Sequence, residues 1–206
     1  NRWAYVSSDD AYFDMVERRD VSRQVFSAIY RHLDCKPNAA QWFDAHRDAK
    51  GGRILHGITY AAGDSVLCAN DGDVFGNKWR DARPVAVAGL VDLWLAQIER
   101  MIPDPTERDH VLDVLAFKLQ RPAVKINHAI LHASLPGSGK DTLYAPFFWS
   151  IGGDSRRNVA LVSNESLSSR WGYDLESEVM VINELRQSEA YDRRARLADV
   201  RPDVRR

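Results

Sequence analysis

Residues 126–142, INHAILHASLPGSGKDT, are the stretch of sequence that decides the fold of this chain. A short apolar run at 126–131 leads into a loop that contains Gly137 and Gly139, and a segment with helical periodicity follows. This order predicts a strand, a glycine loop and a helix, which is the layout that binds nucleotide phosphates. Glycine has no Cβ, so the backbone N–H groups of such a loop can approach phosphate oxygens closely.

The predicted nucleotide site continues from the loop into the first turn of the helix. The helix N-terminus and the ammonium group of Lys140 would both attract the β and γ phosphates of ATP. The spacing departs from the standard pattern twice, because Ser134 replaces a glycine and Asp141 replaces the usual Ser or Thr. A glycine-rich turn with a surface lysine is the alternative. The residues predicted to bind the nucleotide are Pro136, Gly137, Ser138, Gly139, Lys140, Asp141 and Thr142.

A second apolar run, residues 179–182, ends in Asn183 and Glu184. Such a run is typical of a buried parallel strand that delivers a carboxylate to a nucleotide site. Glu184 lies 184 − 140 = 44 residues after Lys140, and these two are the predicted catalytic residues, with Glu184 activating the attacking water. An ordinary core strand that ends in two solvated residues is the alternative. The predicted Mg²⁺ contacts are Asp141, Thr142 and the uncharged Asn183, whose missing carboxylate we expect Asp141 to replace.

Composition indicates a globular chain with one α/β domain and a smaller part. The 206 residues are 45% hydrophobic and 28% charged, with a net charge of −1. No apolar run has the length of a membrane span and no signal pattern precedes the first motif, so we expect a cytoplasmic protein without a membrane partner. Cys35 and Cys68 lack metal or CxxC spacing and are expected to be reduced.

The first 83 residues are expected to form a small α+β region. Residues 3–6 and 11–14 predict a hairpin, and a helix capped by Ser22 should follow. A second short helix is expected from Asn38, and residues 52–79 predict further strands. The stretch 70–73 resembles a calcium loop but lacks its full ligand spacing, so a turn is the better interpretation. The apolar stripe expected on the first helix comprises Val25, Phe26, Ile29, Tyr30 and Leu33.

A helical segment, residues 84–122, is expected between this region and the nucleotide-binding core, residues 123–206. The periodicity of 85–102 predicts one amphipathic helix. Asp104, Pro105 and Glu107 predict the start of another, with the aspartate as cap and the proline in the first turn. After the loop helix, the sequence predicts a break at Gly152 and Gly153, a strand over 158–162 and a short helix over 166–171.

Five segments resemble the helicase part of phage and prophage primase-helicases, which are virus-type superfamily 3 helicases of the AAA+ class. The resemblance implies an α/β fold with a P-loop NTPase core, here incomplete at its C-terminal side. It also implies an ATP- and Mg²⁺-dependent DNA helicase that acts on single-stranded or forked DNA as a hexameric ring. A primase or primase-polymerase module would accompany it in the cytoplasm of a bacterial host. The segments are 102–104, 110–117, 125–129, 137–143 and 181–186.

The resemblance assigns roles to residues that match the family's motifs, and the form Gly-Lys-Asp-Thr is tolerated in this group. Gly137, Gly139 and Lys140 would hold the phosphates, Thr142 or Asp141 would approach Mg²⁺, and Glu184 would activate water.

The chain also departs from the family. Such helicases have a further strand with a polar sensor residue and an arginine finger, whereas 206 − 186 = 20 residues follow Arg186 here. A weakly hydrolysing or non-hydrolysing nucleotide-binding module for oligomerisation or loading is therefore one alternative, and a P-loop kinase for a small substrate is another. The last residues are rich in arginine, which suits either DNA contact or a solvated tail: Arg193, Arg194, Arg196, Arg201, Arg205 and Arg206.

Overall fold

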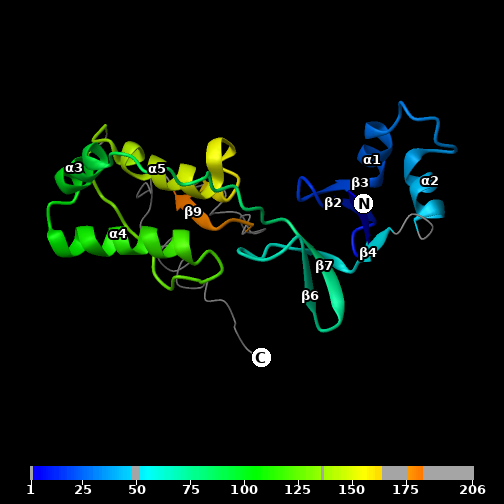
Figure 1. Cartoon of the computed structure of the whole chain (residues 1–206), viewed down its shortest axis with the longest axis horizontal. Helices are drawn as coiled ribbons and strands as arrows, with labels where there is room; N and C mark the ends of the chain where they lie inside the picture. Colours follow the sequence, from blue (N-terminus) through cyan, green and yellow to red (C-terminus); the bar gives the residue numbers. More distant parts are fainter. Residues whose placement is uncertain (1, 48–51, 136, 164–175, 183–206) are drawn as a thin grey trace, which may run out of the picture.

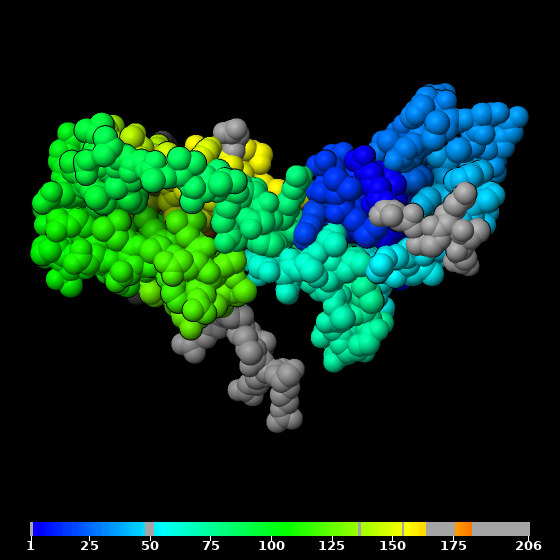
Figure 2. Space-filling model, in the orientation of Figure 1, coloured from blue at the N-terminus to red at the C-terminus, as the bar shows by residue number. Residues whose placement is uncertain are grey.

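The structure is a computed structural model that describes residues 2–47, 52–135, 137–163 and 176–182. It is a mixed α/β fold with small sheets and helices (Figure 1). In the described residues, the strands form sheets of four, three and two strands. Figure 2 shows the surface of the middle sheet between the first elements and the helices that follow.

The first sheet contains the predicted hairpin. Its strand order is β3-β2-β1-β4, with β1 antiparallel to β2 and parallel to β4. Tyr12 and Phe13 are fully buried on opposite faces, so the sheet has a core on each side. The strands are β1 (Trp3–Val6), β2 (Ala11–Asp14), β3 (Arg19–Ser22) and β4 (Arg53–Leu55).

Two short helices, α1 (Arg23–Ile29) and α2 (Ala39–His46), pack on one face of this sheet. The predicted cap at Ser22 and the predicted start of the second helix at Asn38 are confirmed, because both side chains accept hydrogen bonds from backbone N–H groups three residues later. The predicted stripe on the first helix is largely wrong. Phe26 is its buried residue, whereas Val25, Ile29 and Leu33 are 40–48% exposed and Leu33 lies beyond the helix. A two-turn helix presents too short a face to bury five such residues.

The second sheet has the order β5-β7-β6. The turn predicted over 70–73 is confirmed, since Asp71 and Gly72 both have positive φ values, 50° and 90°, as a tight antiparallel hairpin requires. Its strands are β5 (Gly57–Thr59), β6 (Leu67–Asn70) and β7 (Asp73–Asn77).

The helix predicted over 85–102 is shorter in the structure. It is α3 (Asp92–Met101), and residues 84–91 form neither helix nor strand. Val85, Val87 and Leu90 are 90%, 86% and 95% exposed, so the apolar residues before α3 lie away from the core that would stabilise a helix. The next helix, α4 (Pro105–Gln120), begins as predicted, with Asp104 accepting a hydrogen bond from the Glu107 N–H.

The strand predicted before the glycine loop is wrong. Residues 123–135 contain no strand, and Leu131 and Leu135 are 82% and 80% exposed. A strand needs a hydrogen-bonding neighbour, and no other segment in the described part of the chain pairs with these residues. Ile130 packs on the helical core, and His128 stacks on His110 of α4.

The predicted loop helix is confirmed as α5 (Lys140–Gly152), and it ends at Gly152 and Gly153. Two strands follow it, β8 (Val159–Val162) and β9 (Val179–Ile182), and they pair in parallel. Their first residues pack on a core made by α3, α4 and α5. The helix predicted over 166–171 lies outside the described residues. The core is formed by Ile98, Ile102, Val111, Leu115, Leu143, Phe147 and Ile151.

Polar contacts join the first region to the base of the β8-β9 sheet. Asn158 is fully buried, and its amide donates to the carbonyls of Arg80 and Ile151 while its carbonyl accepts from the Tyr60 hydroxyl. Arg157 donates to the carbonyls of Glu17 and Arg18. The division into residues 1–83, 84–122 and 123–206 stays a prediction.

Candidate nucleotide-binding loop

The glycine loop, residues 134–139 with residue 136 outside the described chain, has a backbone that suits anion binding. Gly137 and Gly139 have φ values of 75° and 95°, in the left-handed region that favours glycine. Ser138 lies between them with a negative φ, and such alternation turns successive N–H groups toward one side. No side chain caps the helix that begins at Lys140. The N–H groups of this first turn are therefore oriented as in helix N-termini that bind phosphates.

Lys140 is the first residue of α5 and its side chain is half-buried. Its Nζ lies 3.5 Å from the Ser134 carbonyl oxygen, a long contact that folds the ammonium group back over the loop. The hydroxyls of Ser134 and Ser138 are hydrogen bonded at 2.7 Å, which closes the loop across its base. Ser134, which replaces a glycine of the standard pattern, thus contacts both the lysine and the loop.

Helix α3 supports the loop from behind. The Trp94 Nε1–H donates to the Leu143 carbonyl at 2.9 Å, which fixes α3 against the first turns of α5. Glycine suits the φ of 95° at position 139, and a Cβ there would lie 3.1 Å from the Gln97 amide nitrogen, so the end of that side chain would have to move slightly. By contrast, a Cβ on Gly137 would meet nothing within 4 Å. The periodicity of 85–102 predicted a helix but did not indicate Gln97, because periodicity does not reveal which polar side chain lies against a distant loop.

His132 and Tyr144 form a second contact beside the loop. The His132 Nδ1 lies 3.2 Å from the Tyr144 hydroxyl, and the rings meet edge to face. Burial, followed by the positive charge of Lys140, lowers the pKa of His132. Burial also raises the pKa of the Tyr144 hydroxyl. The pKa of His132 therefore depends on burial and, to a smaller extent, on the charge of Lys140, and the sequence indicated neither effect.

The structure brings together most but not all of the predicted site. Gly137, Ser138, Gly139 and Lys140 form the loop and helix start, and Asp141 and Thr142 are exposed in the first turn of α5. Pro136, Asn183 and Glu184 lie outside the described residues, so their predicted roles stay predictions. Strand β9 ends at Ile182, directly before the last two. Among the described residues, no group of three or more His, Cys, Asp or Glu side chains is placed to hold a metal ion.

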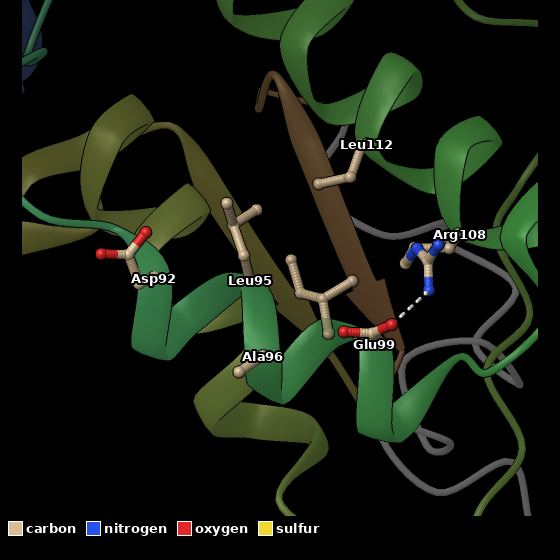
Figure 3. Close-up of a pocket in the computed structure, with 7 residues that line it drawn as sticks. Asp92, Leu95, Ala96, Glu99, Arg108 and Leu112 are labelled. Atoms are coloured by element: carbon tan, nitrogen blue, oxygen red, sulfur yellow. Dashed lines mark ion pairs between the residues drawn. The ribbon is translucent and has the colours of Figure 1, made fainter.

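A cavity of about 360 Å³ lies between α3 and α4, away from the loop (Figure 3). Its wall combines apolar side chains, among them Leu95 and Leu112, with an ion pair of 3.6 Å between Glu99 and Arg108. Figure 3 shows Glu99 and Arg108 joined by this ion pair between the two helices. The cavity is separate from the predicted phosphate contacts.

Comparison with solved structures shows that the fold of this chain is similar to that of the C-terminal region of NrS-1. The apo structure of this C-terminal region, residues 305–718, aligns with 86% of this chain at a TM-score of 0.61 and 14% identity. A second apo structure, the A form, aligns with 88% of this chain at a TM-score of 0.57 and 14% identity.

The chain spans 41% and 44% of the lengths of these two structures. No protein-family model matches the chain, and no curated protein matches it. In the described part of the chain, no helix is long and apolar enough to cross a membrane.

Proposed function

We propose that this chain is the ATP-binding part of a DNA helicase from a phage or mobile-element replication protein, with a P-loop NTPase core. The observation that supports it most is the pair of left-handed glycines directly before the uncapped N-terminus of α5, with Lys140 as its first residue. This arrangement offers several N–H groups and one cation to a phosphate chain. The parallel β8-β9 pair, with Glu184 two residues beyond Ile182, adds the strand arrangement that the helicase resemblance implies.

In this proposal the loop binds ATP through backbone groups and Lys140 neutralises the β and γ phosphates. Asp141 and Thr142 are exposed in the first turn of the helix and would contact a phosphate-bound Mg²⁺. Asp141 would supply the negative charge that the uncharged Asn183 lacks. Glu184 then orients and deprotonates the attacking water. Hydrolysis would drive movement on single-stranded or forked DNA in a hexameric ring, beside a primase or primase-polymerase module.

The test is steady-state ATP hydrolysis with and without single-stranded DNA. We expect hydrolysis that DNA stimulates and that Lys140→Ala abolishes, while Lys125→Ala, which removes an exposed lysine outside the loop, leaves it unchanged. Hydrolysis that survives Lys140→Ala would contradict the proposal. Asp141→Ala and Thr142→Ala divide the metal role, because loss of Mg²⁺-dependent hydrolysis in the second variant alone would refute the part given to Asp141.

A nucleotide-binding module that hydrolyses ATP weakly is the second candidate, and the neutral Asn183 favours it. Without a carboxylate at that position the metal is held less firmly, and turnover falls while binding persists. ATP binding that depends on Lys140 without DNA-stimulated turnover would select this candidate. Transfer of phosphate to an added nucleoside would instead select a small-molecule kinase.

A further inference from the structure

A second pocket lies in the first region, between the start of β1 and the end of α2, far along the sequence from the glycine loop. Its volume is about 190 Å³. This is below the roughly 300 Å³ of sites that enclose whole small molecules, so it suits one planar ring. Aromatic and cationic side chains dominate its wall, and none of the lining residues that the structure describes is acidic: they include Arg2, Trp3, Trp42, Phe43, His46 and Arg47.

Trp42 and His46 form the aromatic wall of this pocket. They lie one turn apart on α2, and their rings stack with centroids 4.4 Å apart and an interplanar angle of 18°. The His46 Nδ1 lies 2.8 Å from the Trp42 carbonyl oxygen, which fixes the imidazole in this position. Trp42 is 37% exposed and lies outside the apolar cluster under the helix, whereas its neighbour Phe43 packs against that cluster. The core therefore does not explain the indole.

Two arginines border the stack. Asp14 accepts hydrogen bonds from the Arg2 Nε and from one terminal nitrogen, at 2.9 and 2.6 Å, and the guanidinium lies 5.5 Å from the Trp3 ring centroid. The Arg47 guanidinium lies 5.4 Å from the Tyr5 ring centroid. The Arg47 guanidinium thus lies over an aromatic face, whereas the charge of Arg2 is balanced by the buried carboxylate of Asp14.

Gly52 packs directly against Arg47. A Cβ built on Gly52 would lie 2.3 Å from the Arg47 Cγ, and the Gly52 N–H donates to the Arg47 carbonyl at 2.7 Å. Any larger residue would push the arginine stem out of this place. Close packing of Gly52 against Arg47 therefore forms this side of the pocket.

We propose that this pocket binds one unpaired base of single-stranded DNA, with the base stacked on the Trp42–His46 pair. The Arg47 guanidinium would donate hydrogen bonds to a phosphate beside the base. Stacked aromatic rings beside fixed cations are the combination that holds single strands without regard to sequence. The stack needs an exposed base face, so paired bases in a duplex cannot enter. Because the site lies on the first region, it gives the chain a hold on DNA that does not require ATP.

The experiment is fluorescence anisotropy of a labelled oligothymidylate with the full chain and no nucleotide. We expect Trp42→Ala to weaken binding about 5- to 100-fold, the effect of one lost base stack. Trp42→Phe should recover most of it, because a ring face remains. Trp149→Ala, which removes another half-exposed indole from α5, should bind as the wild type does. Thermal unfolding of each variant checks that the fold is kept.

A second arm tests the phosphate contacts. Arg47→Gln should make the slope of log affinity against log salt shallower by about 0.7, as expected for one phosphate contact on a single strand. Arg53→Ala is its control, because Arg53 pairs with the buried Ala4 and so points to the other face of the sheet. Unchanged affinity in Trp42→Ala, an equal loss in Trp149→Ala, or equally tight binding of duplex DNA would each overturn the proposal. None of these results depends on ATP hydrolysis, so failure here is distinct from failure of the proposed helicase function.

Discussion

Asn158 is the residue whose replacement tests most sharply how the two parts of the chain are joined. Its side chain is fully buried and makes three hydrogen bonds, to the carbonyls of Arg80 and Ile151 and from the Tyr60 hydroxyl, at 2.9, 3.3 and 3.1 Å. Each such bond contributes about 1 kcal/mol net, and loss of the side chain leaves its buried partners unsatisfied. Asn158→Ala should therefore lower the free energy of unfolding by about 3 kcal/mol.

Urea unfolding followed by intrinsic fluorescence measures this change. Tyr60→Phe removes one of the three bonds and should cost about 1 kcal/mol. The double variant should cost less than the sum of the single ones, because the bond they share is lost only once. Asn127→Ala, at an exposed position, should stay within about 0.5 kcal/mol of the wild type. A loss below about 0.5 kcal/mol in Asn158→Ala would refute the reasoning, since a buried amide with three partners cannot be that cheap to remove.

Three further predictions concern other sites. Burial acts to raise the pKa of Asp14, but hydrogen bonds from Arg2 and from two backbone N–H groups outweigh it and lower that pKa. The stabilisation is fully present above the unfolded pKa of about 3.9 and is lost as the pH falls through the lowered folded pKa, so the stability gap between wild type and Asp14→Asn should close in denaturation series on that acid side. Lys140→Met should raise the pKa of His132 toward its ordinary value in an NMR titration, and an unmoved resonance would contradict the coupling. Gly139→Ala should destabilise the chain more than Gly137→Ala in thermal unfolding, because both positions have positive φ but Gly139 alone is crowded; equal costs would contradict this.

Local signals in the sequence predicted the elements that short-range chemistry determines. The hairpin of β1 and β2, the caps at Ser22 and Asp104, and the starts of α2 at Asn38 and of α5 after Gly139 all depend on neighbouring residues. A cap is a contact with a residue three positions away, so the sequence pattern contains both partners. These predictions are confirmed for that reason.

Predictions that needed a distant partner succeeded less often. The run 126–131 has the composition of a strand, but no described segment pairs with it. The pattern of 85–91 continues that of α3, yet these side chains have no core to face. The contacts of Gln97 with the loop and of Asn158 with Tyr60 join residues that are far apart in sequence, and a single polar residue has no periodicity that would reveal such a partner.

A direct measurement of ATP binding tests whether the glycine loop and Lys140 hold a nucleotide. Titration of a fluorescent ATP analogue into the wild-type chain, the Lys140→Ala variant and the Lys125→Ala control separates the loop from non-specific attraction to a lysine. We expect saturable binding of the analogue by the wild type and the control. Lys140→Ala should lower the affinity at least about tenfold, because a charge-assisted phosphate contact is lost. Equal binding by all three proteins, or no binding to the wild type, would show that the glycine loop does not hold a nucleotide.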